Sequence, residues 1–151
     1  MPGPELGARK CLPEWSRSRV SAHCYLHHLQ AQPNSPAPIS RIVDGDTFDV
    51  AGETIRLCGV DAPEHGDNGF AEAIVALSEI TTKRSVRCLQ VGGGTVCDGR
   101  SRSTNNGRVV AQCFVGEQDL AAELMRRGVV CDWVRFSGGH YSRDGQGRRC
   151  P

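Results

Sequence analysis

The chain has 151 residues, of which 38% are hydrophobic and 23% charged, so a folded domain with its own core is expected. A formal net charge of +1 excludes a general electrostatic attraction to nucleic acid, and no run approaches the ~20 apolar residues of a membrane span. The charge is nevertheless uneven. Residues 41–99 hold five basic and ten acidic residues, whereas residues 100–151 hold nine arginines, no lysine and five acidic residues. An acidic segment that can hold a cation therefore precedes an arginine-rich one that can hold phosphate.

The patterning divides the chain into three parts. Residues 1–36 lack a clean period and end in a proline-rich stretch, so we expect an N-terminal extension or linker that is disordered or outside the mature domain. Residues 37–136 carry the periodic patterns and form the predicted domain. Residues 137–151 are rich in Gly and Arg and show no core-forming pattern, so a tail is expected there.

The first half of the domain alternates short apolar runs with Gly-containing turns. Turns at Asp44-Gly45 and Ala51-Gly52 separate the first three predicted strands. These strands cover residues 39–43, 47–50 and 54–60. A helix is then predicted over residues 70–82, because an apolar stripe recurs there at helical spacing.

The second half continues with a strand over residues 85–90, a long loop over 91–107 and a strand over 108–115. Asp119 is the predicted N-cap of a second helix that ends at Gly128. Residues 129–134 read as extended. The order of elements indicates an α+β, mainly β fold, namely a five-stranded OB-type barrel with two helices packed on it. A mixed α+β sandwich is the alternative.

Carboxylates and arginines gather on the first three strands. Asp46 and Asp61 come from neighbouring strands and can converge on one hard cation, with Asp44 supporting them through water. Glu64 lies beside this position and can accept a proton from an attacking water. Arg56 and Arg108 can make bidentate contacts to a phosphate that gains charge in a transition state. Each residue alone has an ordinary alternative, such as a turn former or a surface ion pair.

These residues belong to a recognisable pattern. Its segments are Val43-Asp-Gly-Asp-Thr47, Arg56-Leu-Cys-Gly-Val-Asp-Ala-Pro-Glu64, Gly107-Arg108 and Leu124-Met-Arg-Arg-Gly128. Over residues 39–136 the chain resembles the staphylococcal nuclease (thermonuclease-like) family. The resemblance implies an OB barrel and a calcium-dependent nuclease that acts on DNA and RNA and leaves 3′-phosphates.

The resemblance also assigns roles by position. Asp46 and Asp61 would be side-chain metal ligands, and Ala62 would supply its backbone carbonyl to the metal. The phosphate would be held by Arg56 and Arg108. Glu64 would be the general base.

The chain departs from the family pattern in three places. Thr104-Asn-Asn-Gly-Arg108 lacks the tyrosine and the basic residue that contact the nucleotide in the family. Ala62 stands where some members of the family carry a threonine, and a carbonyl ligand is indifferent to that change. The long C-terminal helix of the family has no counterpart in residues 137–151, and a disulfide can compensate for it. Trp133 and Phe136 can stack on a base, although core packing is the favoured interpretation.

The chain contains eight cysteines but no Cys-x-x-Cys pair, which argues against a zinc ribbon. The disulfide candidates are Cys88, Cys97, Cys113 and Cys131. Their positions at strand ends and loops favour disulfides in an oxidising compartment, with buried free thiols as the alternative. The resemblance places Cys88 beside Cys113, and Cys97–Cys131 is then the second predicted pair. Cys58 is interpreted as a small core residue.

Cysteine usage favours a secreted or periplasmic protein, although residues 1–40 show no apolar signal region. The favoured function is a monomeric calcium-dependent nuclease with a nucleic acid substrate and no membrane partner. The alternative is a non-catalytic OB-fold module that binds single-stranded nucleic acid. A third interpretation, a secreted disulfide-stabilised domain without a nucleic acid role, leaves the carboxylates and arginines unexplained.

Overall fold

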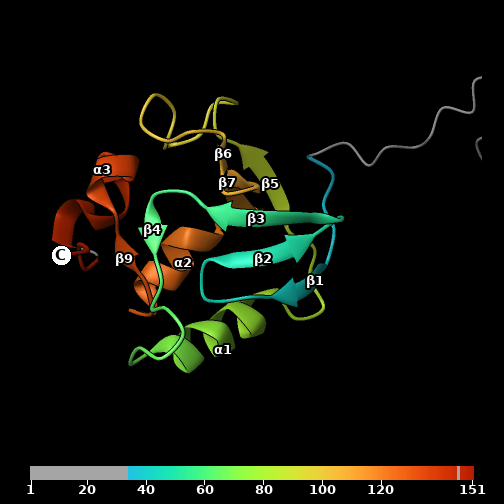
Figure 1. Ribbon diagram of the computed structural model, residues 1–151, viewed down its shortest axis with the longest axis horizontal. Helices are drawn as coiled ribbons and strands as arrows, with labels where there is room; N and C mark the ends of the chain where they lie inside the picture. The colour runs from blue at the N-terminus through green and yellow to red at the C-terminus, as the bar shows by residue number, and fades with distance from the viewer. Residues whose placement is uncertain (1–33, 146) are drawn as a thin grey trace, which may run out of the picture. The chain divides into compact units, whose positions relative to one another are not determined.

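Short strands dominate the fold, which we describe from a computed structural model that covers residues 34–145 and 147–151 (Figure 1). Nearly all of the predicted N-terminal extension, residues 1–36, therefore lies outside the described residues. The strands are β1 (Ile39–Ile42), β2 (Thr47–Val50), β3 (Glu53–Leu57), β4 (Val60–Asp61), β5 (Arg87–Gln90), β6 (Thr104–Asn105), β7 (Arg108–Val115), β8 (Gln118–Asp119) and β9 (Cys131–Asp132). The helices are α1 (Phe70–Thr81), α2 (Leu120–Arg126), α3 (Val134–Ser137) and the 3-10 helix η1 (His140–Gly145).

The main sheet follows the order β1-β2-β3-β7-β5, with β6 and β8 also paired to β7. Pairing is antiparallel except between β3 and β7, which run parallel with Arg56 opposite Val110. The sheet is open and mixed. Its two outer strands approach each other only through an isolated antiparallel bridge between Ala37 and Val86, just before β1 and β5. The α+β, mainly β class is thus confirmed, whereas a closed barrel is not.

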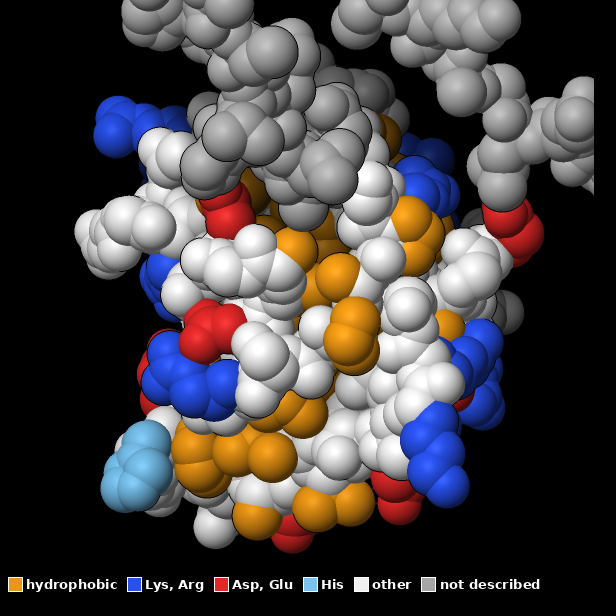
Figure 2. All heavy atoms as spheres, turned by 90° about the vertical axis from the view of Figure 1, so that its right-hand side faces the viewer, with side chains coloured by type: hydrophobic (Ala, Val, Ile, Leu, Met, Phe, Trp, Pro, Cys, Tyr) orange, Lys and Arg blue, Asp and Glu red, His pale blue; other side chains and the backbone are white. Residues whose placement is uncertain are grey.

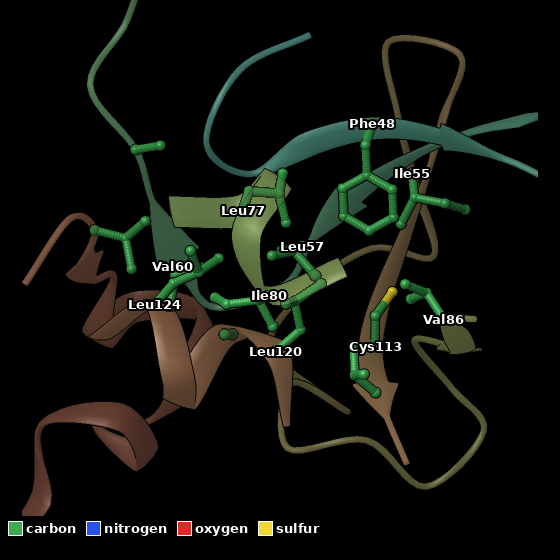
Figure 3. Close-up of a cluster of buried hydrophobic side chains, with 14 of the residues drawn as sticks. Phe48, Ile55, Leu57, Val60, Leu77, Ile80, Val86, Cys113, Leu120 and Leu124 are labelled. Carbon is green, nitrogen blue, oxygen red and sulfur yellow. The ribbon is translucent and has the colours of Figure 1, made fainter. Parts of the chain in front are cut away.

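A single main core lies between the sheet and the first two helices (Figure 3). Phe48 and Ile55 are cross-strand partners on β2 and β3, and both point inward. Leu77 of α1 and Leu124 of α2 are fully buried in the same cluster. Burying side chains of this size contributes about 1.5–3 kcal/mol each, which makes this cluster the main source of stability.

The third strand is shorter than predicted. It ends at Leu57, because Gly59 adopts a positive φ of 76° and turns the chain into β4. A side chain at position 59 would also collide with its surroundings, since an added Cβ would lie 2.9 Å from Ser137 Cβ and 3.0 Å from Cys97 Sγ. The strand β4 pairs with β9 instead of continuing in the main sheet.

The helical predictions agree with the structure. Helix α1 covers residues 70–81, and α2 begins after Asp119, whose carboxylate accepts hydrogen bonds from the backbone N–H groups of Ala121 and Ala122. The helix α2 is followed by Gly128 at φ 71°. The sequence did not predict α3, which begins at Val134, the last residue of the segment expected to be extended.

The C-terminal tail folds onto the domain, and the described residues belong to one compact unit. Cys150 is joined to Cys131 by a disulfide, and the backbone of Arg149 forms a parallel β-bridge with that of Asp132. Tyr141 is only 5% exposed and donates a hydrogen bond to Asp119. A tail without a hydrophobic pattern is therefore fixed by one covalent bond and one buried aromatic ring.

Three disulfides are present among the residues that the structure describes, and they correct two of the predictions. Cys88–Cys113 is confirmed and joins cross-strand neighbours on β5 and β7. The predicted Cys97–Cys131 pair is wrong, because Cys97 bonds to Cys58 and Cys131 bonds to Cys150. Cys58 is therefore a disulfide partner and not a free core residue. Each bond closes a loop of 19–39 residues, for which chain entropy gives about 3–4 kcal/mol.

The surface shows no single dominant charge on the face drawn in Figure 2, where acidic and basic side chains surround a central group of hydrophobic ones. Within the described residues, no helix has the length and apolar character needed to cross a membrane.

Candidate active site

The turn between β1 and β2 places the first carboxylates. Thr47 accepts two backbone hydrogen bonds across the turn, from Val43 and Asp44. The Asp44 carboxylate in turn accepts a hydrogen bond from the backbone N–H of Asp46. Gly45 is needed for close approach, because an added Cβ would lie 2.5 Å from Ala73 Cβ on α1. The turn is thereby pressed against α1, and Asp46 is directed inward.

Asp46 is a buried carboxylate with only 4% exposure. Its Oδ2 accepts a hydrogen bond from the backbone N–H of Ala62 at 2.7 Å, and its Oδ1 accepts one from the Thr47 hydroxyl at 3.0 Å. Burial raises the pKa of Asp46 to about 7, because desolvation outweighs the attraction of Arg56, and the nearby Asp44 raises it further. A buried carboxylate with a raised pKa is a common feature of functional sites.

Arg56 joins the two predicted metal ligands. Its Nη1 lies 3.0 Å from Asp46 Oδ2, and its Nη2 lies 2.9 Å from Asp61 Oδ1. The same Nη1 also donates to the backbone carbonyls of Leu57 and Val60. The side chain is only 11% exposed. We call Asp46, Asp61 and Arg56 the carboxylate cluster.

Asp61 occupies the end of β4, with 37% of its side chain exposed. Its strand partner is Cys131 of β9, so the Cys131–Cys150 disulfide lies next to this carboxylate. Ligand atoms of these three residues lie within 4.8 Å of one another. Because both sulfurs are bonded to each other, they are not thiolate ligands, which leaves the Asp61 carboxylate as the candidate ligand of this trio.

The donor set suits a hard cation. Asp46 Oδ1 accepts one hydrogen bond and Asp61 Oδ2 accepts none within the described part of the chain, although each carboxylate oxygen offers about two lone pairs. Calcium and magnesium prefer such oxygen ligands. A cation would also offset the cost of burying Asp46 in its charged form. Asp44 is half-buried, and its Oδ1 is already used by the turn.

Glu64 and Ala62 follow β4 in the segment that leads to α1. Ala62 is buried and presents its N–H to Asp46. Glu64 is exposed, and its backbone, not its carboxylate, forms a turn with Asp67. The carboxylate therefore has no hydrogen-bond partner among the described residues, which leaves it available to a water molecule.

Arg108 starts β7 and reaches across the sheet toward the first turn. Its Nη1 lies 3.3 Å from the Thr47 hydroxyl, and that hydroxyl donates to Asp46. Its Nε donates to the Asn105 carbonyl at 3.4 Å. The structure thus brings the carboxylates and both arginines together around the β1–β2 turn, from strands that are up to 61 residues apart in sequence.

A cleft of about 620 Å³ opens beside Arg56 and was not predicted from the sequence. We call it the arginine cleft. Four arginines contribute to its lining together with two aromatic residues, namely Arg56, Arg100, Arg102, Arg135, Trp133 and Phe136. No acidic residue lines it among the residues that the structure describes.

The aromatic residues of the cleft correct one expectation. Trp133 is 39% exposed and belongs to no hydrophobic core cluster, so core packing is wrong for this residue. Its ring packs edge-to-face on Phe136, with 4.8 Å between centroids. Only the local excess of arginine after residue 100 could have signalled the cleft, since its walls come from three separate segments.

Two comparisons with known proteins found no match for this chain. No protein-family model matches the chain, and no curated protein matches it. The resemblance to the staphylococcal nuclease family therefore rests on the residues themselves.

Proposed function

We propose that this protein is a metal-dependent nuclease of the staphylococcal nuclease type, which hydrolyses phosphodiester bonds of DNA or RNA with calcium and leaves 3′-phosphates. The observation that carries the proposal is the convergence of Asp46 and Asp61 on one guanidinium, that of Arg56, at the edge of an arginine-rich cleft. A closed OB barrel, completed at the bridge between Ala37 and Val86, is part of the same proposal.

Asp46 and Asp61 would hold the cation, with the carbonyl of Ala62 as a further oxygen ligand. The cation would supply positive charge that neutralises the phosphodiester and lowers the pKa of a bound water. Arg108 would bind a non-bridging oxygen of the phosphate, since its guanidinium has donors left beyond its two weak protein contacts. Glu64 would accept the proton of the attacking water, because it is exposed and lies three residues beyond Asp61.

Arg56 would have a second role besides phosphate binding, which is to position Asp46 and Asp61. Its guanidinium already binds two carboxylates and two carbonyls, so it fixes the distance between the two metal ligands. When a cation replaces part of this attraction, the freed donors of Arg56 can turn to the phosphate. A guanidinium suits both tasks because its donors are arranged in a rigid plane.

A second candidate function is a binding module that holds single-stranded nucleic acid without cutting it. The arginine cleft favours it, because basic and aromatic side chains line it together and such combinations bind strands without sequence preference. The two candidates differ in whether Glu64 matters.

The deciding experiment measures binding and cleavage of one labelled single-stranded oligonucleotide, with calcium and with a chelator. We expect calcium-dependent cleavage by the wild type. Glu64→Gln should lower kcat strongly and change affinity little, because the amide keeps the shape and loses the base. Glu117→Gln is the matched control, since Glu117 is an equally exposed glutamate after β7.

Calorimetry with calcium tests the metal ligands separately. Asp46→Ala should greatly weaken calcium binding while the sheet stays folded, and unchanged calcium affinity would refute the assignment. Binding without cleavage in the wild type, with Glu64→Gln behaving identically, would replace the nuclease with the binding module.

A further inference from the structure

Three arginines of the arginine cleft have no carboxylate partner. Arg100, Arg102 and Arg135 are exposed, and none forms a salt bridge within the described part of the chain, whereas Arg56 forms two. Guanidinium groups that share one cleft repel one another unless an anion lies between them. The other lining residues offer further donors, namely Ser101, Thr104, Asn105 and Asn106.

We propose that Arg100, Arg102 and Arg135 bind a second phosphate of the nucleic acid strand whose neighbouring phosphate lies at Arg56 and Arg108. The proposal takes its substrate class from the proposed function. Arg56 lines the cleft and also belongs to the carboxylate cluster, so a strand can pass from one to the other without leaving the protein surface. Each guanidinium can donate two parallel hydrogen bonds to a phosphate.

The segment that carries Arg100 and Arg102 is held in place by its own contacts. Cys97 is covalently bonded to Cys58 on the floor of the cleft, and the Cys97 carbonyl accepts hydrogen bonds from the backbone N–H groups of Arg100 and Ser101. The Asp98 carboxylate accepts from the backbone N–H of Gly92 and Gly94 and from the Thr95 hydroxyl, which organises the loop ahead of the disulfide. Site residues held by such contacts bind with little ordering cost.

The opposite wall is held by a buried carboxylate. Asp132 is fully buried and accepts a hydrogen bond from the Ser137 hydroxyl, and Trp133 donates its backbone N–H to the carbonyl of Gly59. These contacts fix α3, which carries Arg135 and Phe136. In Figure 1, α3 and the chain before β6 both lie at the upper left.

The two walls meet at Gly138. An added Cβ at Gly138 would lie 2.7 Å from Arg100 Nε, so the Arg100 guanidinium rests against this glycine at the end of α3. The obstacle is the far end of a flexible side chain. A substitution there would therefore displace Arg100 from the cleft without disturbing the core.

The test uses a 12-nucleotide labelled single strand and a dinucleoside monophosphate, which has only one phosphate. Arg100→Gln combined with Arg102→Gln should weaken binding of the 12-mer about 10- to 100-fold, the range for loss of charge-assisted contacts. The salt dependence of binding should become shallower by about 0.7, which corresponds to one phosphate. Cleavage of the dinucleoside monophosphate should not change. Arg84→Gln, at an exposed arginine outside the cleft, is the matched control.

Glycine variants test the position of Arg100 without removing a charge. Gly138→Ala should weaken binding of the 12-mer about tenfold, as loss of one charge-assisted contact does. Gly139→Ala should not, because Gly139 has a similar positive φ of 79° but no atom within 4 Å of its added Cβ. Both positions have a positive φ, of 66° and 79°, so the difference between the variants reports the displaced guanidinium.

The outcomes separate this proposal from the proposed function. Cleavage by the wild type, with 12-mer affinity unchanged in the arginine double variant and in Gly138→Ala, overturns the second phosphate site and leaves the nuclease. Binding without cleavage that the double variant weakens supports the cleft while refuting the nuclease. A wild type that does not bind the 12-mer overturns both.

Discussion

The carboxylate cluster and the arginine cleft share Arg56 but are constructed differently. In the cluster, Asp46 and Arg56 lie on or beside adjoining strands and are buried. In the cleft, the arginines other than Arg56 come from a loop and a one-turn helix and are exposed. Strands place the first group through backbone pairing, whereas the Cys58–Cys97 disulfide and the buried Asp132 carboxylate place the second. We therefore propose the chemistry for the carboxylate cluster, and the binding of the nucleic acid strand for the arginine cleft.

Substitution of Arg56 should have the largest effect on turnover and stability, because Arg56 belongs to both the carboxylate cluster and the arginine cleft. Arg56→Ala should lower turnover about 10²–10³-fold, as loss of a donor to transition-state charge does. It should also lower the free energy of unfolding by about 3–5 kcal/mol, since buried Asp46 loses its ionic partner. Turnover and urea denaturation measure the two effects.

Arg108 provides the matched control for Arg56. Arg108→Ala should lower turnover by a similar factor of about 10²–10³ but leave stability nearly unchanged, because Arg108 contacts only a hydroxyl and a carbonyl. Arg56→Lys should restore neither property fully, since an ammonium lacks the planar fork. Near-wild-type turnover in Arg56→Lys would count against a joint role in positioning and phosphate binding.

A substitution at Gly59 should disturb the packing around the arginine cleft. Gly59→Ala places a Cβ within 3.1 Å of Ser137, Cys97 and Tyr141, so it should destabilise the fold by about 1–3 kcal/mol and weaken oligonucleotide binding. Gly52→Ala is the control, with φ of 83° and nothing within 4 Å of the added atom. Equal denaturation midpoints for the two variants would show that backbone strain, not packing against the cleft, is responsible.

Trp133 should affect binding and not chemistry. Its exposed ring can stack on a base, and such contacts contribute about 1–3 kcal/mol per base. Trp133→Ala should therefore raise KM for the oligonucleotide and leave kcat unchanged, whereas Val134→Ala, at a neighbour that does not line the cleft, should change neither. A fall in kcat without a change in KM would place Trp133 with the cluster instead.

The smallest effect is expected outside both regions, at Glu123 of α2. Hydrogen bonds from Arg126 and then Arg127 lower the pKa of this carboxyl to about 2. Because the folded pKa is depressed, the ionised Glu123 stabilises the fold above its unfolded pKa of about 4.3, and this contribution disappears as pH falls toward 2. Thermal unfolding between pH 2 and 6 should show a weaker pH dependence in Glu123→Gln. An identical pH dependence would mean that the ion pairs contribute nothing.

The longer strands, the two longer helices and the Asp119 cap were predictable because each depends on residues close together in sequence, whereas the two-residue strands β6 and β8 were not predicted. Alternating apolar residues mark β2, a run of mostly apolar residues marks β7, and the carboxylate that caps α2 immediately precedes it. Cys88–Cys113 followed from the placement of β5 beside β7 in the family. The predicted third strand was too long because glycine at position 59 has no periodic signal of its own.

The sequence by itself determined which candidate groups the protein has, namely Asp46, Asp61, Glu64, Arg56 and Arg108. The pairing of β2, β3 and β7 then brings Asp46, Arg56 and Arg108 close together. Only the tertiary structure decided that Cys58 pairs with Cys97, that the patternless tail buries Tyr141, and that arginines from two distant segments face one cleft. Local hydrogen bonding and hydrophobic periodicity involve residues that are close in the chain, so they can be predicted from the sequence. Disulfide pairing and cleft formation depend on which segments meet after the chain has folded, and nothing in the local pattern specifies those meetings.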